Sequence, residues 1–280
     1  MHSPVSRTTI TRVEHGVSAP ADDILVTEEP LEIRLGYGPE HDRAEMRLSV
    51  TMRSPGHDEE LALGFLFTEG LITDPAQVLR VAYCENVKPE ERGNVIRAEL
   101  HPAVDLEPAR WQRNFYTTSS CGVCGKSSIE AVRTQCQRTI TPWGVVEPAV
   151  VTALPDRMRE AQTVFKYTGG IHAAALFDRQ GKLLLLREDI GRHNAVDKVI
   201  GAALLSLAGS LSGVDGCQLL VSGRAGFELV QKCVMAGIPL MAAVGAPSSI
   251  AVQLASESGL TLIGFLRGER FNVYAPADRS

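Results

Sequence analysis

The sequence lacks the motifs that would place it in several large enzyme classes. Its 280 residues contain no P-loop, no GxGxxG after a predicted strand and no GxSxG. Nucleotide hydrolysis, dinucleotide-dependent redox chemistry and serine hydrolysis therefore find no motif support. No apolar run is long enough to cross a membrane, and the N-terminal residues do not resemble a signal peptide. We therefore expect a cytoplasmic protein without a membrane partner.

Concentrated positive charge is also missing. The formal net charge is −5, and the lysines and arginines are scattered along the chain rather than gathered in a stripe. Because nucleic-acid binding depends on neutralising phosphates, we expect no nucleic-acid partner. The remaining composition is that of an ordinary globular protein.

Cysteine is scarce and has one paired motif. The chain has six cysteines, of which Cys121 and Cys124 have the CxxC spacing. A structural zinc site usually needs four nitrogen or sulfur ligands, and no second CxxC or HxxxH follows, so we predict no metal site. Cys217 and Cys233 lie in apolar segments and are expected to be buried and inert.

The richest chemistry lies in the run Ser119-Ser120-Cys121-Gly122-Val123-Cys124-Gly125-Lys126. One thiolate of a CxxC pair can attack while the other stabilises it or resolves the product. The two glycines allow an incoming group to approach the backbone closely. The residues alone leave three interpretations open: a redox dithiol, half of a zinc site, or a sulfur carrier.

Hydrophobic patterning divides the chain into three regions. Residues 1–25 are polar and rich in Pro, Ser and Thr, and we predict a flexible tail. Residues 26–115 are predicted to form a small α+β part, with strands over 31–35, 45–52, 78–83 and 95–100 and a helix between 55 and 70. Residues 116–280 hold the CxxC loop and an α/β domain.

The last region alternates strands with helices. We predict strands over 173–177, 182–186, 218–221, 238–244 and 260–266, and helices from Arg192, over 227–236 and over 248–258. This order predicts a mixed or mostly parallel sheet covered on both faces by helices.

Polar residues gather where these strands are predicted to end. In open α/β sheets, ligands bind outside the carboxyl ends of the strands, near helix N-termini. Four arginines at such turns favour an anionic, phosphate-bearing ligand: Arg192, Arg224, Arg267 and Arg270. For each turn alone, simple capping is an equal alternative. His172 is more typical of a buried hydrogen-bonding residue than of a catalyst, and His193 begins a helix.

Several stretches together resemble the FdhD family, the sulfurtransferase accessory proteins of formate dehydrogenase. The matching stretches cover nearly the whole chain after the tail: Leu63-Gly64-Phe65 with Thr68-Glu69-Gly70, Cys121 to Gly125, Thr168 to Ala175, Glu188 to Ala195 with Asp197-Lys198, and Leu260 to Phe265.

This resemblance implies a sulfur carrier. It implies that Cys121 accepts persulfide sulfur from a cysteine desulfurase, with Cys124 auxiliary, and passes it to the molybdenum or tungsten bis-pterin guanine dinucleotide cofactor needed by formate dehydrogenase. It further implies a homodimer and a three-layer α/β/α fold similar to cytidine deaminases. The cofactor contacts that it implies are Phe265, Leu266, Arg267, Gly268, Glu269 and Arg270.

Three rival functions stay open. In deaminases a glutamate follows the zinc-binding histidine closely, but Ala173 and Ala174 follow His172 here, so deaminase chemistry is disfavoured. A dithiol oxidoreductase would place its CxxC directly after the first strand of a βαβ unit. A non-enzymatic cofactor chaperone would retain its function without the cysteines.

Overall fold

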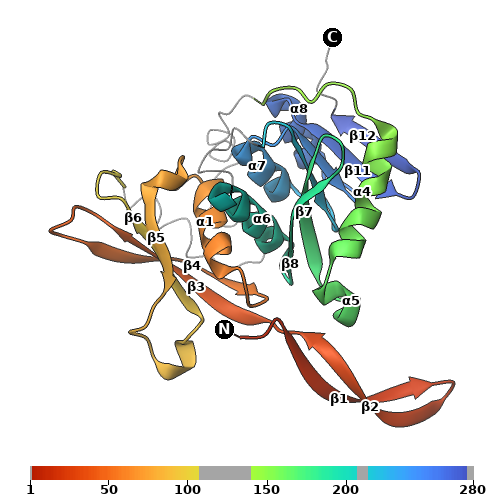
Figure 1. The fold of residues 1–280 in the computed structure, drawn as a ribbon, viewed down its shortest axis with the longest axis horizontal. Helices are drawn as coiled ribbons and strands as arrows, with labels where there is room; N and C mark the ends of the chain where they lie inside the picture. Colours follow the sequence, from red (N-terminus) through yellow and green to blue (C-terminus); the bar gives the residue numbers. More distant parts are fainter. Residues whose placement is uncertain (1, 107–139, 207–213, 276–280) are drawn as a thin grey trace.

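Two sheets and a separate hairpin make up the fold, shown in Figure 1. The structure is a computed structural model that describes residues 2–106, 140–206 and 214–275. Cys121 and Cys124 lie outside the described residues.

A four-stranded sheet forms the N-terminal part, in the order β4-β3-β6-β5. Strands β3 and β6 are parallel, while the two outer strands are antiparallel to their neighbours. The predicted strands and helix are all confirmed. Their bounds are β3 Glu29–Tyr37, β4 Ala44–Arg53, α1 Asp58–Thr68, β5 Val78–Tyr83 and β6 Val95–Leu100.

Alternation along β3 explains which face of this sheet is covered. Leu31, Ile33 and Leu35 are buried, whereas Glu32 and Arg34 between them are partly exposed. Side chains two apart share one face of a strand, so the apolar face packs toward α1 and the charged face remains open.

The larger sheet has the order β12-β11-β10-β9-β7-β8. Strands β9, β10 and β11 are parallel, and β7, β8 and β12 are antiparallel to their neighbours, so the predicted mixed sheet is confirmed. Its strands are β7 His172–Asp178, β8 Leu183–Asp189, β9 Cys217–Val221, β10 Leu240–Ala243, β11 Thr261–Arg267 and β12 Arg270–Ala275.

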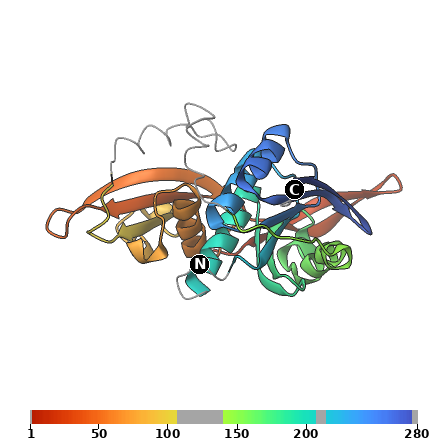
Figure 2. The ribbon, with the colours of Figure 1, turned by 90° about the horizontal axis from the view of Figure 1, so that it is seen from above.

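Helices cover both faces of this sheet, which gives the three predicted layers. Figure 2 shows α4 on one side and α7 and α8 on the other. The bounds are α4 Pro148–Ala161, α5 Val164–Thr168, α6 Arg192–Ser206, α7 Phe227–Ala236 and α8 Ser249–Ser258. None of the helices in the described ranges is long and apolar enough to span a bilayer.

The sequence did not lead us to expect α4 and α5. Helix α4 contains Pro155 in its interior, a residue that normally ends a helix. Its start carries the expected signal, because Pro148 occupies the first helical position, where its missing N–H costs nothing.

Helices α1 and α6 join the two parts of the fold at a very close crossing. A Cβ on Gly64 would collide with the carbonyl oxygen of Asp197, and a Cβ on Gly201 would collide with that of Glu60. Glycine is therefore required at both positions for these backbones to touch. The buried apolar cluster continues across the crossing, from Leu31 in β3 to Leu229 in α7.

Residues 1–25 differ from the flexible tail that we predicted. The structure has an antiparallel hairpin there, with β1 over Val5–Glu14 and β2 over Val17–Val26. Both turn residues have positive φ, 50° at His15 and 80° at Gly16, as a two-residue type I′ turn requires. The two-residue His15-Gly16 turn between segments that contain Thr and Val indicates a hairpin. The Pro and Ser content of the region had favoured a flexible tail instead.

Candidate functional site

The predicted clustering of polar turns is confirmed at one edge of the larger sheet. The carboxyl ends of β9, β10 and β11 share this edge because the three strands are parallel. Strand β7 begins and β8 ends at the same edge, where His172 pairs with Asp189. The structure thus brings together turns that are up to about 95 residues apart in the sequence, from His172 to Arg267.

A cavity of about 540 Å³ opens at this edge. Its volume is within the range of roughly 300–1,000 Å³ that is typical of small-molecule sites. The ends of the sheet strands form one wall, and α4, α5 and the following glycines form the other. The lining residues are Pro155, Met158, Arg159, Gln162, Phe165, Gly169, Gly170, Ile171, His172, Ile190, Ser222, Val244, Leu266 and Arg267.

His172 is a partly buried side chain in this cavity. Burial lowers the pKa of its imidazole, and the positive charge of Arg192 lowers it further. The ring is therefore neutral at pH 7, so it can accept a hydrogen bond from a ligand at one nitrogen and donate one at the other.

The segment 265–270 lies at the cavity but contributes unevenly. Leu266 and Arg267 line the cavity, and Leu266 is fully buried in the core beneath it. Arg267 donates from Nε to the carbonyl oxygen of Val244 at 3.4 Å. Gly268 and Glu269 form the exposed turn between β11 and β12, and Arg270 pairs with Arg267 across it. The segment is thus partly cavity lining and partly an exposed surface turn.

Phe265 has an unusual backbone conformation. Its φ is +53°, and its side chain is 41% exposed although it lies between two buried strand residues. A left-handed conformation is costly for an aromatic residue, and such strain persists where the surrounding structure enforces it. Here a register shift between Gly264 and Arg267 interrupts pairing with β12, and Phe265 N–H donates to the Gly245 carbonyl at 3.0 Å.

Gly245 holds the neighbouring loops together. Its N–H donates to the carbonyl of Gly223 at 2.9 Å, and a Cβ at this position would lie 3.0 Å from that same oxygen. Beyond it, Ala225 and Pro247 form a parallel bridge between the loops that follow β9 and β10. Backbone hydrogen bonds therefore link the loops that follow β9 and β10 to one another at the edge of the cavity.

Glu188 fixes the opposite wall of the cavity. Its carboxylate accepts hydrogen bonds from the backbone N–H groups of Thr163 at 3.0 Å, Val164 at 2.8 Å and Phe165 at 2.8 Å. These are the first donors of α5, whose own preceding residue supplies no side-chain cap. A carboxylate from β8 thus takes the place of a local cap. Sequence reasoning missed this role because no local spacing connects Glu188 with α5.

Asp189 connects the cavity edge to the N-terminal part. Its carboxylate accepts hydrogen bonds from the N–H of Gly191 at 2.8 Å and the N–H of Ser54 at 3.2 Å. The ammonium of Lys198 lies 2.6 Å away. Burial raises the pKa of Asp189, and the positive Lys198 opposes that effect. The segment that begins α6 is therefore locked onto the end of β4.

The other charged residues predicted at this edge lie outside the cavity lining. His193 Nε2 is 3.2 Å from a carboxylate oxygen of Glu228, which links the starts of α6 and α7. Arg192 is partly exposed, and Arg224 is exposed. Arg159 and Phe165, which sequence reasoning missed, lie close instead, with the guanidinium 4.4 Å from the ring centroid.

The described ranges contain no group of three His, Cys, Asp or Glu side chains that could hold a metal ion. Cys217 and Cys233 are buried, as predicted. Burial raises the pKa of Cys217 to about 11, which makes it a poor nucleophile.

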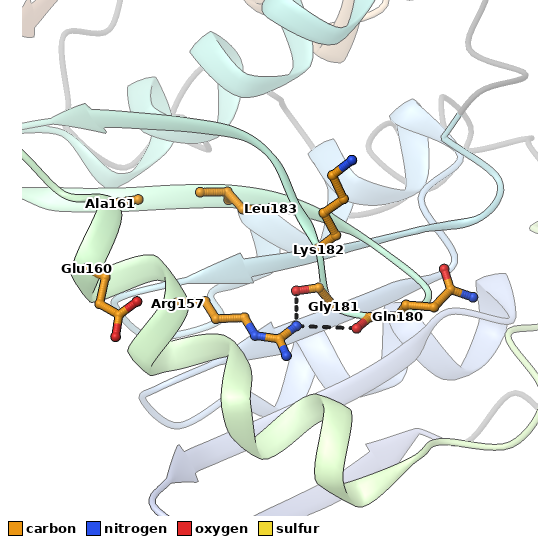
Figure 3. Close-up of a pocket in the computed structure, with 7 residues that line it drawn as sticks. All are labelled: Arg157, Glu160, Ala161, Gln180, Gly181, Lys182 and Leu183. Carbon is orange, nitrogen blue, oxygen red and sulfur yellow. Dashed lines mark hydrogen bonds between the residues drawn. The ribbon is translucent and has the colours of Figure 1, made fainter.

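A second hollow lies between α4 and the β7–β8 turn and is shown in Figure 3. The Arg157 guanidinium donates to the backbone carbonyl of Gln180 at 3.3 Å and to that of Gly181. These bonds engage its one arginine in holding the turn, so we assign no ligand to this hollow.

Comparisons with known proteins give a consistent result over nearly the whole chain. The family described as FdhD/NarQ matches residues 26–280. A protein named sulfur carrier protein FdhD from Streptomyces avermitilis is 52% identical, covering 98% of this chain and 94% of the relative. One of the same name from Mycobacterium tuberculosis is 51% identical, covering 92% and 91%.

A solved structure from Desulfotalea psychrophila has the same fold. Its protein, described as a formate dehydrogenase accessory protein, superposes with a TM-score of 0.72 over 98% of both chains. The sequence identity is 24%, so this likeness concerns the fold alone.

Proposed function

This chain belongs to the FdhD/NarQ family, and we propose that it is a sulfurtransferase that carries sulfur from a cysteine desulfurase to the molybdenum or tungsten bis-pterin guanine dinucleotide cofactor of formate dehydrogenase. The observation that carries this proposal is the Cys121-Gly-Val-Cys124-Gly run within a chain that matches named sulfur carriers over nearly its whole length.

Cys121 accepts the sulfur in the first step. Its thiolate attacks the terminal sulfur of a persulfide on the desulfurase, and the S–S bond of that persulfide breaks. The desulfurase cysteine leaves as a thiolate, and Cys121 becomes Cys121–S–SH. Sulfur moves at the sulfane oxidation level, so this step needs neither an oxidant nor a reductant.

The second step delivers sulfur to the cofactor, which is the substrate. Transfer as sulfide requires two electrons, and a second thiol supplies them. Cys124 attacks the inner sulfur of the persulfide, the Cys121–Cys124 disulfide forms, and HS⁻ leaves toward the metal. A cellular thiol then reduces the disulfide. An external thiol can replace Cys124 in this role, so we expect Cys124 to be auxiliary.

The cavity at the sheet edge fits one nucleotide end of this substrate. Arg267 and Arg159 offer guanidinium groups for phosphate, and Phe165 and the exposed ring of Phe265 offer faces for stacking. The neutral imidazole of His172 offers a donor and an acceptor to a base or a pterin. The cavity is too small for the whole substrate, so we place the second pterin and its nucleotide on the open surface beyond Phe265.

Intact-protein mass spectrometry tests the first step directly. The protein is incubated with cysteine and a cysteine desulfurase and then measured without reductant. We expect an added mass of about 32 Da, one sulfur atom, on the wild type and on Cys217→Ala, but not on Cys121→Ala. Cys217 is the matched control because it is a buried cysteine. Absence of the adduct from the wild type, or its presence on Cys121→Ala, would refute the proposal.

Maturation of the client enzyme separates this proposal from its rivals. Cys121→Ala should abolish formate dehydrogenase activity in cells that lack the native carrier, and Cys124→Ala should reduce it less. A cofactor chaperone would retain full function in both variants. A dithiol oxidoreductase would lose function equally in both, because neither thiol can then form a disulfide with the other.

The same proposal includes the setting of the protein. We propose that it acts in the cytoplasm, where cysteine desulfurase and the maturing formate dehydrogenase are both accessible, and that it is a homodimer. Light scattering on the purified full chain tests the oligomeric state.

A further inference from the structure

The hairpin of β1 and β2 has two edges of different character. Figure 1 shows it extending away from the two larger sheets, with α5 alongside β2. In the described part of the chain, β1 pairs with no strand other than β2. A two-stranded hairpin is at best marginally stable alone in water. Further contacts along its outer edges are therefore expected to stabilise it.

The register shows which backbone groups face outward. Thr27 N–H donates to the Pro4 carbonyl at 2.9 Å, so this pair is hydrogen-bonded. Such pairs alternate along an antiparallel ladder, and a two-residue type I′ turn closes on one, here Glu14 with Val17. The even-numbered residues of β1 therefore bond to β2. The odd-numbered residues direct their N–H and C=O groups outward: Val5, Arg7, Thr9, Thr11 and Val13.

The outer edge of β2 is protected against another strand. Pro20 occupies an outward position opposite Thr11 and has no N–H to donate. The outward N–H of Ile24 already donates to the Asp23 carboxylate at 2.9 Å. Proline and charged side chains are common means by which proteins block strand addition.

The outer edge of β1 has no comparable protection. Val5 N–H donates to Ser3 at 3.2 Å, which closes the end nearest the body of the protein. From Arg7 to Val13 the edge has no proline, and Thr9, Thr11 and Val13 are exposed. An intact edge of this length is a template for another strand.

Resting on the homodimer proposed above, we propose that this edge is its interface, at which β1 pairs antiparallel with β1 of a second copy of the chain. The strand is complementary to itself. With Thr9 opposite Thr9 of the second copy, Arg7 faces Thr11 and Ser6 faces Arg12, so no like charges meet and β-branched threonines pair across the axis. A two-fold axis then relates the two hairpins, which together form one four-stranded sheet. The contact is isologous, so the assembly is closed at two copies.

Proline substitution on either edge gives a matched test. Thr9 and Ser18 are both exposed hydroxyl residues whose N–H groups face outward, one on β1 and one on β2. Neither Thr9→Pro nor Ser18→Pro removes a hydrogen bond within the hairpin. By sedimentation at micromolar concentration, the wild type and Ser18→Pro should be dimers and Thr9→Pro a monomer. A monomeric wild type, or a dimeric Thr9→Pro, overturns the proposal.

Hydrogen exchange in the unmodified protein keeps the proposal falsifiable even if Thr9→Pro fails to fold. The outward amides of Arg7, Thr9 and Thr11 should exchange at least about tenfold more slowly than those of Ser18 and Asp22 in the same sample, because only the former are paired in the dimer. Equal exchange on the two edges refutes pairing through β1. Since neither experiment involves Cys121 or the cavity, sulfur transfer can fail its own test while this interface stands, and the reverse.

Discussion

The ammonium group of Lys198 lies 2.6 Å from the carboxylate of Asp189, and both side chains are 1% exposed or less. The same ammonium donates to the carbonyl of Ser54 at 2.8 Å. One buried ion pair therefore joins α6, the end of β8 and the end of β4, directly behind Ile190 at the cavity.

Replacing Lys198 with methionine should destabilise the protein strongly. The substitution leaves Asp189 buried without its cation, which typically costs about 3–5 kcal/mol. Urea unfolding measures the change in the free energy of unfolding. The double variant Asp189→Asn/Lys198→Met should recover part of the loss because no charge is then stranded. A loss below about 1 kcal/mol in Lys198→Met would contradict this account.

Acid stability should depend on Glu60. Burial raises the pKa of its carboxyl, but hydrogen bonds from Arg187, one of 2.7 Å, and from His57 outweigh burial and lower the pKa to about 2. A carboxyl with a depressed folded-state pKa stabilises the protein above its unfolded pKa and loses that effect as the pH falls toward the folded value.

Between pH 7 and pH 3 the wild type should therefore lose about 1–2 kcal/mol more unfolding free energy than Glu60→Gln, after allowance for solvent screening. Urea unfolding at each pH gives the comparison. Glu59→Gln is the control, since Glu59 is an exposed neighbour on α1. If Glu60→Gln and Glu59→Gln follow the same pH dependence, the Arg187 pair does not stabilise the fold.

Ligand binding should distinguish Arg267 from Arg270. Arg267 lines the cavity, whereas Arg270 lies beyond the turn. Losing a hydrogen bond to a charged group costs about 1.5–3 kcal/mol, so Arg267→Ala should weaken binding of GDP, a stand-in for one end of the substrate, roughly ten- to hundredfold. Arg270→Ala should bind nearly as the wild type does. Equal calorimetric Kd values for Arg267→Ala and wild type would remove Arg267 from the site.

Removing the Glu188 carboxylate should loosen the α5 wall. In Glu188→Ala, the amides of Val164 and Phe165 lose an acceptor that carries charge, so their hydrogen exchange should accelerate about tenfold or more. GDP affinity should fall as well, because Phe165 lines the cavity. Glu160→Ala is the control, with the same charge change on an exposed position of α4. Unchanged exchange in Glu188→Ala would show that α5 forms without this cap.

Sequence patterns predicted those regular elements that have a clear period, but not α4, α5 or the β1–β2 hairpin. The alternation in Leu31 to Leu35 and the helical spacing of Val196, Val199 and Ile200 follow directly from which face is buried. The rule that ligands bind at carboxyl strand ends correctly placed Arg267 at this edge. His172 reaches the same edge because β7 runs antiparallel to β9 and begins there.

What the sequence did not reveal depends on contacts between distant segments. The α5 wall requires a carboxylate 23 or more residues away in the chain, and the left-handed backbone of Phe265 arises from interrupted pairing with β12. The expected similarity to cytidine deaminases stays a prediction, as does the division of the chain near residue 115. Cys121 and Cys124 lie outside the described residues, so the roles expected for them stay predictions.

The glycine contact between α1 and α6 limits how this protein can be recombined. Since the backbones themselves touch at Gly64 and Gly201, no layer of adaptable side chains separates the two parts. A chimera that takes its first hundred residues from one relative and the remainder from another inherits two helices that were never fitted to each other. A chimera of two relatives should therefore fold when α1 and α6 come from the same parent. The segment to keep intact in such chimeras is the helix pair rather than either sheet.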